Sequence, residues 1–176
     1  MCLIHGGQEI ETCGCCSYIC FFSLLGIYKG DYEKKRLSEC EAFAELFEYI
    51  KNQVRFFLTP TKVMYRNFAN DLLEKSGFLP ELRSHEQDDI YCNVWNVSFE
   101  KCMKYFHLTE KQRSLIMDFG DVIGKSNGEI QMQSFDYYIS MLKNETEKQR
   151  AETEKNIKLY RTLGIAAGAC AAILII

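Results

Sequence analysis

Both ends of this chain carry a stretch without a single charged residue, and these two stretches limit the ways in which it can fold. The first covers residues 12–28 and the second covers residues 162–176. As helices they would measure roughly 25 and 22 Å, against about 30 Å for the hydrocarbon core of a bilayer. The second stretch extends to 157–176 if Lys158 and Arg161 reach toward the lipid headgroups. We therefore predict transmembrane helices at 12–28 and 157–176.

A cleaved signal peptide is the alternative interpretation of the first stretch, but signal peptides begin with basic residues. Here Glu9 and Glu11 precede the stretch, and the first lysine or arginine is Lys29. Because every lysine and arginine lies between residues 29 and 161, the positive-inside rule predicts that the middle of the chain faces the cytoplasm. We expect a short tail at 1–11 and a cytoplasmic helical bundle with membrane-proximal stalks at 29–156.

The composition favours helices and argues against nucleic-acid binding. Lysine plus arginine number 21 against 24 acidic residues, so the net charge is −3 and there is no basic excess for phosphate groups. With 47% hydrophobic residues the chain can form a core, and its only prolines are Pro60 and Pro80. Since so few residues interrupt helices, we predict an all-α fold, an antiparallel helical bundle.

Apolar residues recur at helical spacing in the first half of the middle segment. From Leu37 to Phe57 they follow one another at steps of three and four, which predicts one long amphipathic helix. Thr59 is a typical N-cap residue, and Pro60 fits the first position of a second helix. We expect that second helix to bury Val63 and to end at Gly77.

The next part of the chain alternates polar connections with amphipathic stretches. Residues 81–89 are polar and acidic, which indicates a surface connection, and residues 90–106 form a third amphipathic stretch. Thr109 and Gln112 have the spacing of a capping box, in which each side chain bonds the other residue's backbone N–H. The capping box predicts the start of a fourth helix.

A turn should separate the fourth helix from the fifth. Gly124 is placed to end the fourth helix, and Ser126 with Glu129 forms another capping box. The fifth helix should bury its apolar side chains between Ile130 and Leu142. Beyond them, residues 143–156 have no apolar stripe, which predicts a solvated helical stalk.

The nine cysteines and three histidines form no recognisable site. Cys13, Cys15 and Cys16 lie together in the first uncharged stretch, without the second pair of ligands that a zinc site needs. We interpret them as small apolar residues, with lipid modification as an open alternative. The histidines lack metal-ligand spacing and a nucleophilic partner. We therefore expect no cofactor, no metal and no catalytic residue, and we predict that the protein is not an enzyme.

The run from Gly120 to Ser126 has some features of a nucleotide-binding P-loop. A P-loop has four residues between its two glycines, so that successive backbone N–H groups converge on the phosphates. Here three residues separate Gly120 from Gly124, and Phe119 stands where the glycine would be needed. An amphipathic helix precedes the run, whereas a P-loop follows a strand. We interpret the run as a turn between two helices.

An ordered pattern surrounds this turn: Phe119, Gly120, Ile123, Gly124, Asn127 and Gln131. It resembles the F-G-x-x-L-G-x-x-D-x-x-x-Q stretch of the stage III sporulation protein AB family, with isoleucine for leucine and asparagine for aspartate. Thr59-Pro60 matches a T-P step of the family, and Tyr160-Arg161-x-Leu163-Gly164 matches the approach to its C-terminal apolar segment. The resemblance covers residues 13–176.

The resemblance implies a component of the membrane complex encoded by the SpoIIIA operon of endospore-forming bacteria. Family members are similar to the type II secretion F-protein, whose cytoplasmic helical bundles lie against a secretion ATPase. The chain would then be a platform in the mother-cell membrane around the forespore, with its bundle in the cytoplasm. The implied partners are the other membrane proteins of the operon, a SpoIIIAA-type ATPase and membrane lipid, and no nucleic acid.

Two alternatives belong to other classes. A tail-anchored helical groove protein that binds partner helices would also be all-α, but the N-W-G-R helix start of that class is absent. An NTPase would need the P-loop that the spacing excludes. Finally, Gly164, Gly168 and Ala172 place small residues on one helix face, which favours close helix packing in a membrane. Whether this packing joins copies of the chain into a homo-oligomer is left open.

Overall fold

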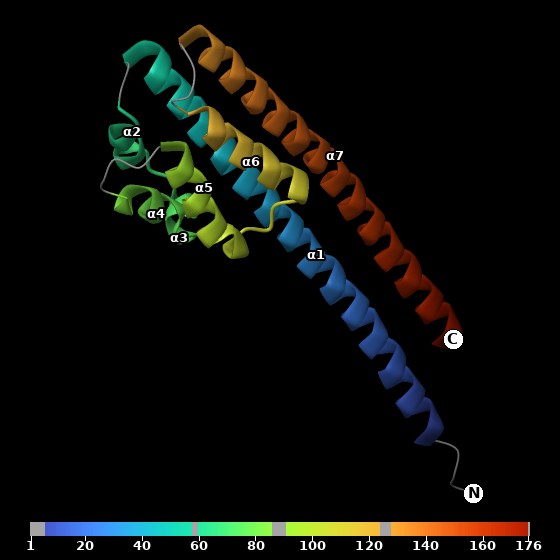
Figure 1. Ribbon diagram of the computed structural model, residues 1–176. Coiled ribbons are helices and arrows are strands. Elements are labelled where there is room, and N and C mark those ends of the chain that lie inside the picture. Colours follow the sequence, from blue (N-terminus) through green and yellow to red (C-terminus); the bar gives the residue numbers. More distant parts are fainter. Residues whose placement is uncertain (1–5, 58–59, 86–90, 124–127, 176) are drawn as a thin grey trace, which may run out of the picture. The chain divides into compact units, whose positions relative to one another are not determined.

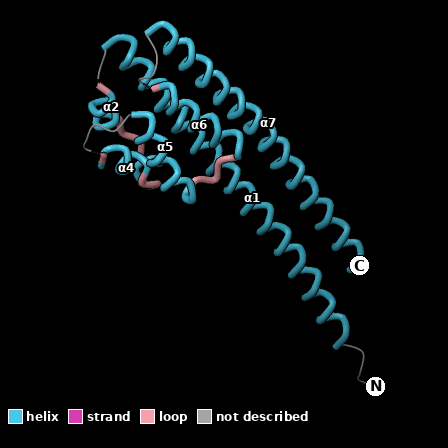
Figure 2. Tube along the Cα trace, viewed as in Figure 1, coloured by secondary structure: helices cyan, strands magenta, loops and turns pink. Residues whose placement is uncertain are grey.

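The described part of the computed structural model is helical and contains no strand (Figures 1 and 2). It comprises residues 6–57, 60–85, 91–123 and 128–175. The elements are α1 (Gly6–Asn52), a π-helix (Gln53–Phe57), α2 (Thr61–Asn67), α3 (Asp71–Lys75), α4 (Phe78–Ser84), α5 (Tyr91–Cys102), a 3₁₀-helix (Met103–Tyr105), α6 (Glu110–Val122) and α7 (Gly128–Ile175). The prediction of an all-α fold is confirmed.

The chain divides into two compact units. One contains residues 1–34 and 150–176, and the other contains residues 35–149. No helix of the described residues has a segment long and apolar enough to cross a membrane. The transmembrane helices expected at 12–28 and 157–176 are therefore not supported. Their uncharged cores would be only about 25 and 22 Å long as helices, shorter than a bilayer's hydrocarbon layer.

Within the unit 35–149, helices α1 and α7 run antiparallel. Lys51 pairs with Asp136, and Glu48, one turn earlier on α1, pairs with Lys143 further along α7. Cys40, earlier still on α1, shares a side-chain hydrogen bond with Thr146 on α7. The contacts from α1 thus meet α7 at rising residue numbers as the α1 residue number falls, which is the arrangement of two antiparallel helices.

The core of this unit is aromatic and lies against the apolar stripe of α1. Phe43 packs against Phe78, Phe99 and Phe106, with ring centroids 5.2–5.6 Å apart. The stripe predicted from Leu37 onward is confirmed for the fully buried side chains Cys40, Phe43, Phe47 and Ile50. These contacts join α1 to the shorter helices that follow it.

The same stripe fails at Phe57, which is 69% exposed although the helical spacing predicts burial. The α-helix ends at Asn52, and Gln53–Phe57 continue it as a π-helix. A π-helix bonds i to i+5, so it inserts an extra residue into the turn and shifts the face on which later side chains lie. Phe57 consequently leaves the buried face.

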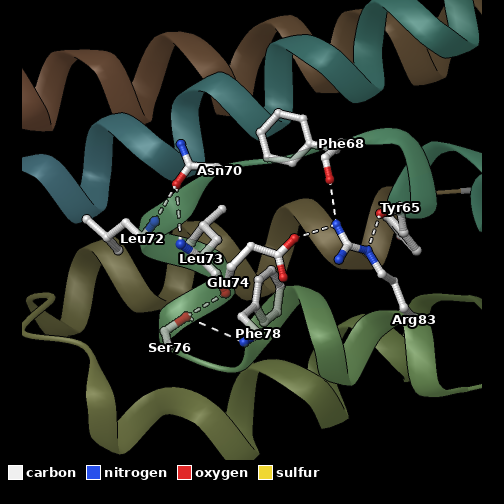
Figure 3. Close-up of polar contacts among 9 residues, drawn as sticks. All are labelled: Tyr65, Phe68, Asn70, Leu72, Leu73, Glu74, Ser76, Phe78 and Arg83. Atoms are coloured by element: carbon white, nitrogen blue, oxygen red, sulfur yellow. Dashed lines mark hydrogen bonds and ion pairs between the residues drawn. The ribbon is translucent and has the colours of Figure 1, made fainter.

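The second predicted helix is in fact two helices. Pro60 is the N-cap of α2 and not its first helical residue, and Thr59 lies outside the described residues. The chain is extended at Phe68, and α3 then starts from Asn70, whose Oδ1 accepts hydrogen bonds from the backbone N–H groups of Leu72 and Leu73. Figure 3 shows this cap. The apolar spacing alone predicts one helix here, but the N-cap at Asn70 starts a new helix within the segment.

The side chain of Val63, expected to be buried, is 41% exposed because the short helix α2 turns this position toward solvent. Gly77 was predicted to close the second helix, and it follows α3 with φ +83°. This left-handed conformation is favourable for glycine, because a side chain there would clash with the backbone.

Residues 81–84 belong to α4, so the expected surface connection at 81–89 is wrong in its first part. Leu82 is buried, and the guanidinium of Arg83 donates to the backbone oxygens of Tyr65 (2.9 Å) and Phe68 (2.5 Å). It also pairs with Glu74 at 2.7 Å (Figure 3). Arg83 thereby satisfies carbonyl groups at the C-terminal end of α2. Residues 86–89 lie outside the described residues.

The fourth helix is predicted well at its start. Thr109 Oγ1 accepts from the backbone N–H of Gln112 at 3.2 Å, and Gln112 Oε1 accepts from that of Thr109 at 2.9 Å. The capping box that opens α6 is thus confirmed. Gly124 and Ser126, expected to form the next turn, lie outside the described residues.

Two expectations about α7 require correction. Ile130, predicted to be buried, is 61% exposed because it lies in the first turn of α7, before the buried positions Phe135, Ile139 and Leu142. The segment 143–156 is helical as predicted but is not solvated on all sides. Its side chains Thr146, Gln149 and Thr153 are buried. These three side chains form a buried face of α7, but because they are polar, apolar periodicity in the sequence does not predict it.

Candidate functional site

The pattern residues of α6 lie in the core around the single tryptophan. A Cβ atom on Gly120 would lie 2.0 Å from Cδ1 and 2.5 Å from Cγ of Trp95. The indole Nε1 of Trp95 donates to the backbone oxygen of Ile116 at 2.9 Å. Only a glycine lets α6 approach the indole this closely. Gly120 is therefore needed for packing, and it contributes no exposed chemical group.

Phe119 and Gln131 complete this cluster. The Phe119 ring stacks on Phe47 with centroids 3.6 Å apart and interplanar angle 5°, and it lies 5.0 Å from Phe135. Gln131 is 6% exposed, and its Nε2 donates to the backbone oxygen of Val122 at 3.1 Å. This bond satisfies a carbonyl in the last turn of α6, where helices lack internal donors. The pattern thus ties α6 to α7 and to α1.

The remaining predicted site residues are not tested. Thr59, Gly124, Ser126 and Asn127 lie outside the described residues, and Pro60 is exposed at the start of α2. The positions of Gly164, Gly168 and Ala172 belong to α7, but their surroundings are not described. Their interaction roles stay predictions.

A buried carboxylate that the sequence reasoning missed lies between α1 and the loop before α6. Glu39 is 1% exposed, and its Oε2 accepts from the backbone N–H of His107 at 2.6 Å. Its Oε1 lies 2.8 Å from Nδ1 of the same histidine. Glu39 precedes Phe43 by one helical turn, so it lies on the buried face of α1. A charged residue on an otherwise apolar face is visible in the sequence and could have indicated a buried polar contact. These two contacts hold the loop that contains His107 against α1.

A polar seam also lies between α1, α6 and α7. The Nε2 of Gln112 donates to Oε1 of Gln149 at 2.7 Å, and Thr146 Oγ1 donates to the backbone oxygen of Leu142 at 2.8 Å. Burial raises the pKa of the Cys40 thiol to about 12, so this thiol is protonated and unreactive at neutral pH. The seam satisfies polar groups inside the bundle and offers no activated nucleophile.

The described residues form no group of three or more histidine, cysteine, aspartate or glutamate side chains placed to hold a metal ion. The clusters described above are internal packing and capping arrangements.

The family model described as stage III sporulation protein AB (spore_III_AB) matches residues 11–176. The chain belongs to the stage III sporulation protein AB family. Among solved structures, one of "Stage III sporulation protein AB (SpoIIIAB)" is similar at TM-score 0.56 and 14% identity. The match covers 68% of this chain and 97% of that one, and it shows that the two share a fold.

No curated protein matches the chain. The pattern from Phe119 to Gln131 indicated the stage III sporulation protein AB family, and that expectation is confirmed. Membership implies a role in sporulation and association with other proteins of the sporulation complex. The place of Gly120 and Gln131 in the core gives a physical reason for this part of the pattern.

Proposed function

We propose that this member of the stage III sporulation protein AB family is a non-enzymatic scaffold of the SpoIIIA channel complex, which is required for endospore formation. The observation that carries the proposal is the family match, which extends over residues 11–176 and includes the whole helical unit 35–149. A scaffold needs a rigid surface more than reactive groups. The aromatic core and the capped helices of this unit supply such rigidity.

The proposed location is the mother-cell membrane around the forespore, with the unit 35–149 in the cytoplasm. In the other unit, large apolar side chains are exposed at Tyr28 (74%), Leu159 (54%) and Leu163 (54%). Tyr28 and Leu163 belong to the two uncharged stretches, Leu159 lies just before the second, and basic residues flank both stretches on their inner sides. Such a distribution favours contact of the chain's ends with lipid.

Membrane attachment can be tested by fractionation of sporulating cells. We expect the full chain in the membrane pellet, resistant to high salt and to alkaline carbonate. A soluble chain, or one released by salt alone, would contradict insertion of its apolar ends. Protease treatment of intact cells should leave residues 84–89 uncut, because the proposal places them inside.

The proposed cytoplasmic partner is the SpoIIIAA-type ATPase, and the proposed membrane partners are the other membrane proteins of the operon. Affinity isolation of the tagged full chain from sporulating cells, in mild detergent, should recover both kinds of partner. The purified full chain alone should neither bind nor hydrolyse ATP, and Lys125→Ala should leave partner recovery unchanged. ATP hydrolysis by the purified chain that Lys125→Ala abolishes would replace the scaffold proposal with an NTPase.

A further inference from the structure

One face of α7 stays exposed where this helix continues toward Ile175 (Figure 1). The exposed positions recur at steps of three and four, so they share one face of the helix: Lys155, Lys158, Leu159, Thr162 and Leu163. We call these five residues the outer stripe. Leu159 and Leu163 lie one turn apart, and each is 54% exposed. Neighbouring large apolar side chains on an exposed helix face are typical of an interaction surface.

The outer stripe changes from basic to apolar along its length. Lys155 and Lys158 come first, and the later members are uncharged. Glu154 is the last acidic residue of the sequence, so the only charged side chains from 155 to 176 are those two lysines and Arg161. Both lysines are exposed on the face that carries the leucines. This order fits a surface with a negatively charged outer layer and an apolar layer beneath it.

The hydroxyl within the outer stripe is satisfied by its own helix. Thr162 Oγ1 donates to the backbone oxygen of Lys158 at 3.0 Å. This bond to the carbonyl four residues earlier uses the one hydrogen that the hydroxyl can donate. Hydrocarbon offers no hydrogen bonds, so a polar group that faces it must find its partner within the protein. Thr162 can therefore lie between the two leucines in contact with acyl chains.

On α1, tyrosines are exposed next to the first uncharged stretch. Tyr28 is 74% exposed, and Tyr32, one turn further on, is 39% exposed. Lys29 is the only charged residue from 12 to 30. Tyrosine is enriched at the level of lipid headgroups, because its ring contacts apolar groups while its hydroxyl reaches water. Both helices thus combine basic charge with interfacial side chains at the start of an uncharged segment.

We propose that the outer stripe lies in the interface of a membrane that contains anionic lipid, with its lysines at the lipid phosphates and its leucines among the acyl chains. This inference rests on the proposed membrane location, and it adds the class of lipid and the face of α7 that meets it. Helices at such an interface bind through apolar burial and through attraction to anionic headgroups. A parallel contact with the outer stripe of a second copy would place lysines together, and like charges oppose such a contact.

The depth of the outer stripe can be measured with tryptophan reporters in the full chain, reconstituted into lipid vesicles. Bromine atoms on acyl chains quench a tryptophan only when it lies among those chains. Leu163→Trp places the reporter in the apolar part of the stripe. Ala151→Trp is the matched control, because Ala151 is exposed on the same face of α7, about 18 Å before Leu163 at 1.5 Å per residue. The native Trp95 is completely buried within the unit 35–149 and supplies a constant background.

The class of lipid is tested in vesicles that contain equal amounts of phosphatidylglycerol and phosphatidylcholine, with bromine on only one of the two in each preparation. Lys155→Gln/Lys158→Gln, combined with the reporter at 163, removes the cations of the outer stripe. Lys143→Gln/Lys148→Gln is the matched control. It removes the same charge from lysines of the same helix whose side chains are 55% and 58% exposed.

We expect strong quenching of Leu163→Trp and no quenching of Ala151→Trp beyond the background. Around Leu163→Trp, phosphatidylglycerol should bind at least about threefold more strongly than phosphatidylcholine. Lys155→Gln/Lys158→Gln should remove this preference, whereas Lys143→Gln/Lys148→Gln should keep it.

Absence of quenching at Leu163→Trp, in vesicles that retain the chain, would show that protein such as a second copy covers the outer stripe. That result, or equal quenching of the two reporters, would overturn the inference and leave the membrane location intact. Equal quenching by the two lipids would overturn the assignment to anionic lipid. So would a preference that survives Lys155→Gln/Lys158→Gln, or one that both pairs of lysine substitutions reduce equally. A wild-type chain that floats with neither lipid would contradict the proposed membrane location as well.

Discussion

Gly120 lies so close to the indole of Trp95 that a Cβ atom at this position would be 2.0 Å from the indole Cδ1. Trp95 is completely buried, and its Nε1 donates to the backbone of α6 one turn before Gly120. The hydrogen bond and the close packing therefore both hold the five-membered ring of the indole against α6. This relationship fixes the crossing of α5 and α6, and it explains a glycine inside a helix.

Gly120→Ala should destabilise the protein by about 3 kcal/mol or more, because the added methyl group must displace a rigid, buried indole. Gly128→Ala is the matched control, since a Cβ there meets no atom within 4 Å. Its effect should stay within about 0.5 kcal/mol. Urea unfolding followed by far-UV circular dichroism measures both. Similar midpoints for the two variants would show that the indole can move aside.

Gln131→Ala should cost about 1–2 kcal/mol, because it leaves the backbone oxygen of Val122 without its side-chain donor in the interior. Gln133→Ala, at an exposed position in the same turn of α7, should be nearly neutral. The same unfolding experiment compares the two. An equal effect of both substitutions would mean that only helix propensity is involved.

Glu39→Ala should lower the free energy of unfolding by about 2–3 kcal/mol, because it leaves the backbone N–H of His107 without an acceptor. Glu39→Gln keeps one acceptor oxygen and should cost less. Glu41→Ala, which removes an exposed carboxylate from the same helix, should cost least. Thermal denaturation of the three variants checks this order. If Glu39→Ala were as stable as Glu41→Ala, the contact with His107 would not hold the loop.

The buried thiol of Cys40 predicts a specific loss of stability in alkali. An unfolded thiol loses its proton near pH 9, whereas burial raises the pKa of the folded one to about 12. Between these values the native state binds more protons than the unfolded state, so stability falls as pH rises. The slope from this group is at most about 1.4 kcal/mol per pH unit. It should be absent below pH 8.

Denaturation of the wild type and of Cys40→Ala at several pH values isolates this effect, because all other groups titrate in both proteins. The stability difference between the two proteins should be constant below pH 8 and should shrink from pH 9 upward. A difference that stays constant up to pH 11 would show that Cys40 does not keep its proton through burial.

Short-range signals in the sequence predicted much of the fold. The capping box of Thr109 and Gln112 was found because both of its hydrogen bonds lie within one turn. The buried stripe from Cys40 to Ile50 follows from helical periodicity in the same way. Such features depend on neighbouring residues alone, so one sequence suffices to detect them.

Other features depend on residues that are distant in the chain. Gly120 was noted as part of a pattern, but its cause is Trp95 on another helix. Glu39 meets His107 across a long stretch of sequence. Arg83 was assigned to a loop because its surroundings are acidic, although its partners are backbone groups of α2. In each case the packing of helices decides the role of the residue.

The most direct test of the scaffold account is the distribution of the SpoIIIAA-type ATPase between membrane and soluble fractions of sporulating cells. We predict that the ATPase is found with membranes when this chain is present and becomes soluble when its gene is deleted. Restoring the wild-type chain should return the ATPase to the membranes. An ATPase that stays with the membranes in the deletion strain would contradict the claim that this protein holds it there.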